Sequence, residues 1–73
     1  MAVCYNKLFK LMIDQKISNA ELRKRAGISA NIISKLKHDR YISLDSIEKI
    51  CGVMGCSVDQ MLEFVPEQDE VKE

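Results

Sequence analysis

The sequence predicts an all-α domain of five helices. Serine, a residue that commonly starts helices, precedes four successive segments that contain apolar residues: these are Ser18, Ser29, Ser43 and Ser57. Within the segments, apolar residues recur every three or four positions, which is the spacing of a helix with one buried face. The chain of 73 residues has three Gly and one Pro, too few for a turn-rich β fold.

The first helix is expected from about Cys4 to Asp14, after a short loose arm at residues 1–3. Its predicted core residues share one face at helical spacing: they are Tyr5, Leu8, Leu11 and Met12. Lys7 and Lys10 fall on the opposite side of the same helix and should face the solvent.

Two capped helices joined by a glycine turn are expected between Ser18 and Lys37. The Ser18 side chain can accept a hydrogen bond from the Glu21 backbone, and the Glu21 carboxylate can accept one from the Ser18 N–H, which is a capping box. Gly27 supplies the left-handed conformation that ends a helix at little cost. Ser29 then caps a second helix, at about 29–37, and the pair forms a helix-turn-helix pattern.

The helix at 29–37 has two different faces. At about 100° per residue, one side gathers the residues expected to face the core: Ser29, Ile32, Ile33 and Leu36. The other side is small or polar: Ala30, Asn31, Ser34, Lys35 and His38. An Asn can pair with adenine, a Lys can donate to guanine, and a small side chain admits a thymine methyl group. This composition suits contact with DNA bases, although an ordinary solvated helix face has similar residues.

Two further helices are expected in the second half of the chain. Ser43 begins one that continues to about Met54, with an apolar stripe on its inner face: Leu44, Ile47, Ile50, Cys51 and Met54. Ser57 and Gln60 form a capping box for a short last helix. Its apolar residues include Phe64 and Val65, which either cover the core of a monomer or form a dimer contact. The folded domain should span residues 1–65, followed by an acidic, disordered tail at 66–73.

The net charge is zero, but the charges are unevenly distributed. Residues 1–43 hold nine Lys and Arg against three acidic residues, and residues 44–73 hold two against eight, which gives +6 and −6. The basic half contains the helix-turn-helix pattern, and such a half attracts nucleic-acid phosphates. The acidic half favours a second reading, in which the chain is a helical protein-interaction module, antitoxin-like or an accessory regulator.

The stretch SNAELRKRAGISANIISKLK, residues 18–37, resembles the helix-turn-helix of the Cro/C1-type (Xre-like) bacterial and phage regulators. It is most similar to the short single-domain branch, in which Glu-Leu-Arg precedes Ala-Gly-Ile-Ser, and the resemblance extends from about Tyr5 to Phe64. It implies a five-helix, lambda-repressor-like DNA-binding domain that regulates transcription in the cytoplasm. Such a protein reads the major groove of double-stranded DNA with the helix at about 29–37, as a homodimer.

The resemblance also implies roles for single residues. Base contacts would come from Ala30, Asn31, Ser34 and Lys35. Phosphate contacts would come from the two helix starts and from the loop after the second helix: Ser18, Asn19, Ser29, Lys37, Arg40 and Tyr41. Two positions depart from the family pattern. Asn19 stands where glutamine is common and has a shorter reach, and Arg23 stands where a small residue is usual.

The sequence contains no pattern typical of an enzyme. It lacks a Gly-rich phosphate loop and a cluster of metal ligands, and its one histidine, His38, has no evident nucleophile as a partner. We therefore expect no catalysis, no cofactor and no small-molecule ligand. No run of about 18 apolar residues and no secretory leader is present, so we expect a cytoplasmic protein without a membrane association.

The sequence has three cysteines, Cys4, Cys51 and Cys56. An odd number in a chain without an export signal does not favour a disulfide framework. The spacing of Cys51 and Cys56 does not match the pairs that hold zinc. We expect the three thiols to be buried and to pack as small apolar groups. Redox sensing has no support in the sequence.

Overall fold

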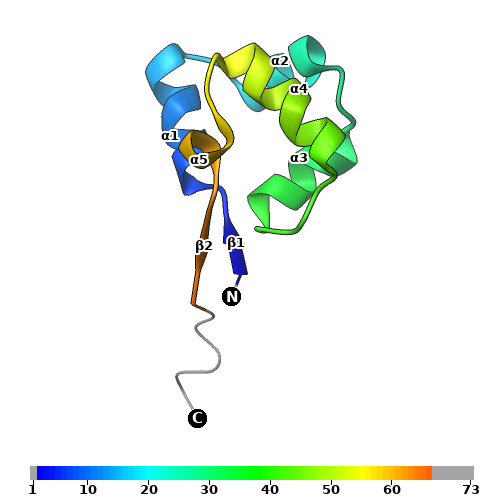
Figure 1. Cartoon of the computed structure of the whole chain (residues 1–73). Helices are drawn as coiled ribbons and strands as arrows, with labels where there is room; N and C mark the ends of the chain where they lie inside the picture. The colour runs from blue at the N-terminus through cyan, green and yellow to red at the C-terminus, as the bar shows by residue number, and fades with distance from the viewer. Residues whose placement is uncertain (1, 67–73) are drawn as a thin grey trace.

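The computed structural model describes residues 2–66, in which two short strands flank five helices (Figure 1). The order is β1 (Ala2–Cys4), α1 (Asn6–Gln15), α2 (Asn19–Ala26), α3 (Ala30–Lys37), α4 (Leu44–Met54), α5 (Val58–Met61) and β2 (Glu63–Val65). The predicted fold class of five helices is confirmed, with a small strand pair in addition. Except for Pro66, the predicted acidic tail lies outside the described residues.

The predicted serine caps of α2, α3 and α4 are confirmed. Each serine Oγ accepts a hydrogen bond from the backbone N–H three residues later: Ser18 from Glu21 at 3.1 Å, Ser29 from Ile32 at 3.3 Å and Ser43 from Ser46 at 3.2 Å. At α5, the Ser57 N–H donates to Gln60 Oε1 at 2.9 Å, as the predicted capping box requires. These bonds satisfy N–H groups that a helix start otherwise leaves without partners.

One detail of the first cap is wrong. The Glu21 carboxylate, expected to accept from the Ser18 N–H, instead pairs with the Arg25 guanidinium one turn later, at 2.7 Å. A charged partner on the same helix face forms the stronger hydrogen bond and draws the carboxylate away from the cap.

The turn between α2 and α3 is built on Gly27. Its φ of 68° lies in the left-handed region, and its N–H donates to the Arg23 carbonyl oxygen at 2.9 Å. The N–H of Ile28 reaches the same carbonyl oxygen at 3.2 Å. This closure ends α2 and directs the chain into α3 within two residues.

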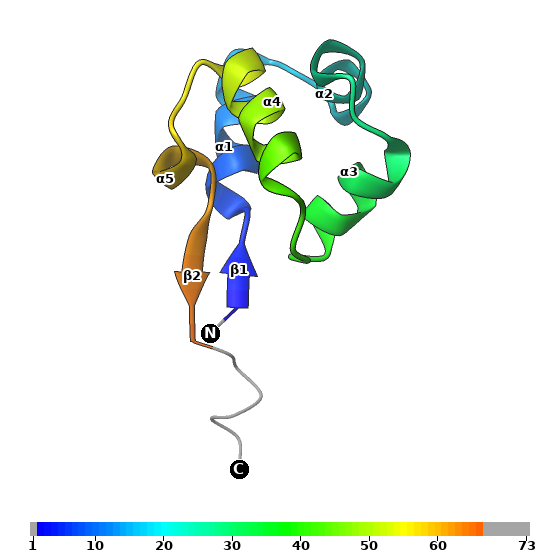
Figure 2. The same cartoon turned by 45° about the vertical axis from the view of Figure 1, so that its right-hand side comes forward.

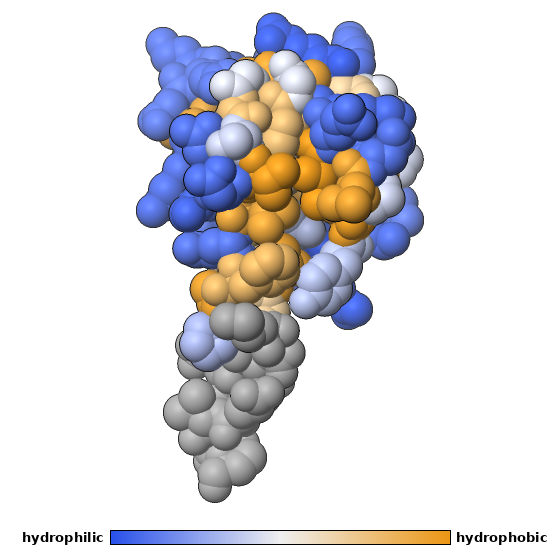
Figure 3. Space-filling view, in the orientation of Figure 1, coloured by the Kyte–Doolittle hydropathy of each residue, from blue (hydrophilic) through white to orange (hydrophobic). Residues whose placement is uncertain are grey.

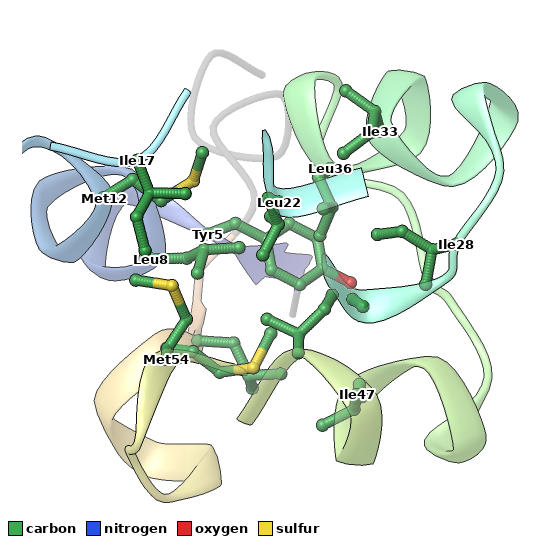
Figure 4. Packing of buried hydrophobic residues seen from close by; sticks show 14 of the residues in the cluster. Tyr5, Leu8, Met12, Ile17, Leu22, Ile28, Ile33, Leu36, Ile47 and Met54 are labelled. Atoms are coloured by element: carbon green, nitrogen blue, oxygen red, sulfur yellow. The ribbon is translucent and has the colours of Figure 1, made fainter. Parts of the chain in front are cut away.

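The core lies between the helices, where side chains from α1, α2, α3 and α4 point toward one another (Figure 4). The most enclosed side chains are Tyr5, Leu8, Leu22, Leu36, Ile50 and Met61. The inner faces predicted for α1, α3 and α4 are therefore largely correct, with Leu11, Ile32 and Cys51 half-buried. Leu44 is the exception: it is 80% exposed because it is the first residue of α4, where the helix has not yet reached the core.

The predictions for the two ends of the domain were wrong. Instead of a loose arm, residues 2–4 form β1, which pairs antiparallel with β2 so that Ala2 faces Val65 and Val3 faces Phe64. The first helix consequently starts at Asn6, not Cys4, and the last helix ends at Met61. Leu62 has an extended backbone and leads into β2. Figures 1 and 2 show the two strands side by side below the helices.

Candidate nucleic-acid interface

The outer face of α3 carries the residues predicted to contact bases. Ala30, Asn31, Ser34 and Lys35 are all exposed. The opposite face of the helix is held by Ile33 and Leu36, which are buried in the core. Figures 1 and 2 place α3 at the margin of the molecule, on the side away from α1 and α5. The helix is therefore fixed by one face and presents the other to solvent.

A shallow hollow of about 430 Å³ lies between α2 and α3. It brings two predicted phosphate contacts, Asn19 and Lys37, to the same surface as two predicted base contacts, Ala30 and Ser34. Three of its other lining residues were not among the predicted contacts: Ala20, Arg23 and His38. Arg23 follows Asn19 by four residues, and His38 follows Ser34 by four. Helical spacing could therefore have identified both.

A second hollow, of about 580 Å³, lies between the end of α3 and the following loop. It joins Lys35, a predicted base contact, with Arg40 and Tyr41, two predicted phosphate contacts. Ser34 and His38 line both hollows. The His38 Nδ1 lies 2.8 Å from the Ser34 carbonyl oxygen and can donate to it, which holds the ring over the end of α3.

The remaining predicted site residues lie outside these two hollows. Asn31 is exposed near the start of α3 and lines neither of them. Ser29, which was predicted to face the core, is instead exposed beside it, because its hydroxyl oxygen accepts from the Ile32 N–H to cap the helix. Ser18 lines a third hollow, together with Lys24 and Arg25. The first hollow thus groups Asn19, Ala30, Ser34 and Lys37. The second groups Ser34 with Lys35, Arg40 and Tyr41.

Tyr5 holds the loop that carries Arg40 and Tyr41, a connection that the sequence did not reveal. Its hydroxyl donates to the Arg40 carbonyl oxygen at 2.7 Å, and its backbone N–H donates to Asp39 Oδ1 at 3.1 Å. Asp39 has a left-handed backbone, with φ of 54°. Burial, helped by the negative charge of Asp39 and by Tyr41, raises the pKa of Tyr5, so its hydroxyl stays a donor at neutral pH.

The electrostatics of this surface favour an anionic partner. Lys35, Lys37 and Arg40 are exposed, and none of the ion pairs formed among residues 2–66 involves α3 or the loop after it. On α2, by contrast, Arg25 is already paired with Glu21. The cations around α3 therefore remain available to phosphates.

Residues 2–66 contain no group of three or more His, Cys, Asp or Glu side chains that could hold a metal ion. None of the helices in that range is both long and apolar enough to span a membrane.

A capped helix pair with an exposed, cation-flanked second helix defines a helix-turn-helix DNA-binding domain. The chain belongs to the Cro/C1-type helix-turn-helix (HTH) DNA-binding domain family, whose model matches residues 7–67. This match confirms the resemblance noted in the sequence, and membership of a family of DNA-binding domains agrees with the prediction that the chain is not an enzyme.

A solved structure supports the same assignment. The chain is similar to the transcriptional regulator VanUg in its crystal form II, with 36% sequence identity and a TM-score of 0.87. The similarity covers 90% of this chain and 88% of that one. A comparison with curated proteins found no match.

Proposed function

We propose that this protein is a sequence-specific transcriptional regulator that binds double-stranded DNA with α3 in the major groove. The observation that carries the proposal is the outer face of α3, where four small or hydrogen-bonding side chains are exposed: Ala30, Asn31, Ser34 and Lys35. Two of them, Asn31 and Lys35, have the hydrogen-bonding groups that direct readout of bases requires. Asn31 can pair with adenine and Lys35 can donate to guanine, while Ala30 and Ser34 allow the close approach that such pairing needs.

The surfaces beside α3 would hold the DNA backbone. On one side, Asn19 and Lys37 share a hollow with the base-reading face; on the other, Arg40 and Tyr41 share a hollow with Lys35. Contacts on both sides of a recognition helix fix its register in the groove without reading sequence themselves. The exposed helix starts at Ser18 and Ser29 would add further phosphate contacts.

We propose further that the protein acts as a homodimer. Leu44 of α4 is 80% exposed and Phe64 of β2 is 56% exposed, and apolar surface covers much of the face formed by these elements (Figure 3). Exposed apolar surface of this kind is typical of an interaction site. A two-fold pair would place two α3 helices in successive major grooves, about 34 Å apart.

Selection of bound duplexes from a random-sequence pool tests this function directly. We expect enrichment of a motif with two-fold symmetry. Affinity for the selected site should fall by roughly 0.9 log units per contacted phosphate for each log unit of salt. Weak binding without enrichment would contradict sequence-specific regulation and would favour the protein-interaction module instead.

A matched pair of lysine variants sharpens the salt titration. Lys37→Ala should weaken binding to all duplexes and reduce the salt slope by about one. Lys10→Ala removes the same charge from α1, which lies away from α3, and should leave the slope unchanged. Equal effects of the two variants would mean that the attraction comes from overall charge and not from the α3 surface.

A further inference from the structure

Three sulfur atoms come together where α4 ends and α5 packs against it. The Cys51 thiol donates to the thioether of Met61, with Sγ and Sδ 3.5 Å apart. Met61 is fully buried, whereas Cys51 and Cys56 are half-buried and are therefore reachable from solvent. Met61 is therefore the inner member of the cluster, and the two thiols lie closer to solvent.

The helix end explains why Cys56 lies beside Cys51. Gly55 has a left-handed backbone, with φ of 67°, and its N–H donates to the Cys51 carbonyl oxygen at 2.8 Å. The Cys56 N–H returns to the same oxygen at 3.2 Å. This closure commonly brings the side chains of its first and last residues into contact. Consistent with that contact, burial and the neighbouring Cys51 thiol raise the pKa of Cys56.

We propose that Cys51, Cys56 and Met61 bind one soft monovalent metal ion, of which Cu(I) is the representative. Thiolate and thioether sulfur are the ligands that favour Cu(I), whereas structural zinc takes four nitrogen or sulfur ligands without a thioether. A planar three-sulfur site with metal–sulfur bonds of about 2.3 Å separates its sulfur atoms by about 4 Å. The Sγ–Sδ separation of 3.5 Å needs only a small opening to reach this value.

The binding step leaves all oxidation states unchanged. Cu(I) displaces one proton from each of the two thiols, both protons pass to solvent, and the thioether adds its lone pair without losing a proton. The bound ion with two thiolates carries one net negative charge.

The spacing of the cysteines in the sequence does not indicate this site, because one of its three ligands is a methionine. The sequence predicted that all three thiols would be buried as apolar packing groups, but only Cys4 is buried, and Cys51 and Cys56 are half-buried. The structure adds Met61, ten residues beyond Cys51, as a partner of the Cys51 thiol.

The test is a titration of the reduced full-length protein with Cu(I) in the absence of oxygen, read by native mass spectrometry and by the thiolate-to-copper absorption band. We expect one ion per chain and a higher melting temperature, because the ion binds only the folded arrangement. Cys51→Ser and Cys56→Ser should each abolish binding. Met61→Leu keeps the core volume. Because it removes a direct ligand, it should lower the affinity for Cu(I) by at least roughly 10–100-fold, the loss typical of removing an outer-shell partner.

Cys4→Ser is the control, since Cys4 lies in β1 and is not part of the cluster. It should bind Cu(I) as the wild type does. The proposal fails if Met61→Leu retains full affinity, if Cys4→Ser loses it, or if the thiols take up copper without a fixed stoichiometry. The proposal also fails if added peroxide forms a Cys51–Cys56 disulfide equally fast in the presence and in the absence of Cu(I), because bound Cu(I) should protect both thiols. DNA binding is measured separately, and none of these outcomes bears on it.

Discussion

We propose Asn31 as the residue on which base recognition most clearly depends. It is exposed near the start of α3, and its amide forms no hydrogen bond within residues 2–66. Both its donor and its acceptor are therefore available to a base edge. A substitution there should change DNA binding without changing the fold, since the side chain takes no part in the core.

We predict that Asn31→Ala weakens binding to the selected site by about 1–3 kcal/mol and relaxes the preference at one base pair. The melting temperature should remain close to that of the wild type. Titration of the selected duplex and of a scrambled duplex checks this result, because the scrambled duplex reports phosphate attraction alone. Unfolding of the variant, or an equal loss on both duplexes, would show that this face of α3 is not the reading face.

Tyr5→Phe tests the residue that holds the loop after α3. Losing the hydrogen bond to the Arg40 carbonyl oxygen should lower the free energy of unfolding by about 0.5–1.5 kcal/mol. Tyr41→Phe is the control, because Tyr41 is 64% exposed and its hydroxyl should matter to DNA and not to stability. Chemical denaturation distinguishes the two variants, and equal stability losses would contradict the assigned roles.

The Tyr5 variant also carries a pH dependence. The pKa of Tyr5 is raised above 10.0 in the folded protein, so its contribution to stability is complete below that pH and is lost as the pH rises through the folded pKa. The difference in stability between wild type and Tyr5→Phe should therefore narrow in strongly alkaline solution. A difference that widens there would contradict the neutral-donor role of the hydroxyl.

At the scale of the elements, a Gly→Ala substitution should have opposite effects on stability in the turn at Gly27 and within helix α4. A Cβ added at Gly27 or at Gly52 meets nothing within 4 Å, so only the backbone decides the outcome. Gly27→Ala should destabilise the protein by about 1–2 kcal/mol, because its φ is +68°. Gly52→Ala lies inside α4 and should stabilise it by about 0.5–1 kcal/mol. Thermal unfolding of both variants checks the sign, and a shift of both in one direction would refute this account.

Elements with local start signals could be predicted from the sequence. The caps at Ser18, Ser29 and Ser43 depend on a backbone N–H three residues away, so the sequence contains the whole interaction. The strands could not be predicted, because each has three residues and is defined by a partner about 60 residues away. A three-residue segment shows no period, and Phe64 and Val65 fitted a helix as well as a strand.

The candidate site shows the same division. The polar face of α3 followed from helical spacing, and the structure leaves all four predicted base-contacting residues exposed. The connection of Tyr5 to Arg40 spans 35 residues and has no signature in either segment. The hollow that joins Arg23 to α3 depends on the crossing of two helices, which only the packed core defines.

At the scale of the whole molecule, sedimentation at micromolar concentration tests the proposed dimer. We expect a dimer, and we expect Phe64→Ser to raise its dissociation constant at least about tenfold, since burying a Phe contributes about 1.5–3 kcal/mol. Ile13→Ser removes a residue that is 75% exposed on α1 and should have no such effect. A wild-type species of only 8.3 kDa would exclude a dimer in solution and leave assembly on DNA.

The strand pair also sets the order of events when the chain is made on the ribosome. β1 is synthesised about 60 residues before its partner β2. The helix caps and turns can form as each segment appears, because their partners are nearby. The backbone of Val3, a residue buried in the finished protein, has no strand partner until Phe64 has been synthesised. We therefore expect nascent chains that do not yet include β2 to be more prone to aggregate than the complete domain.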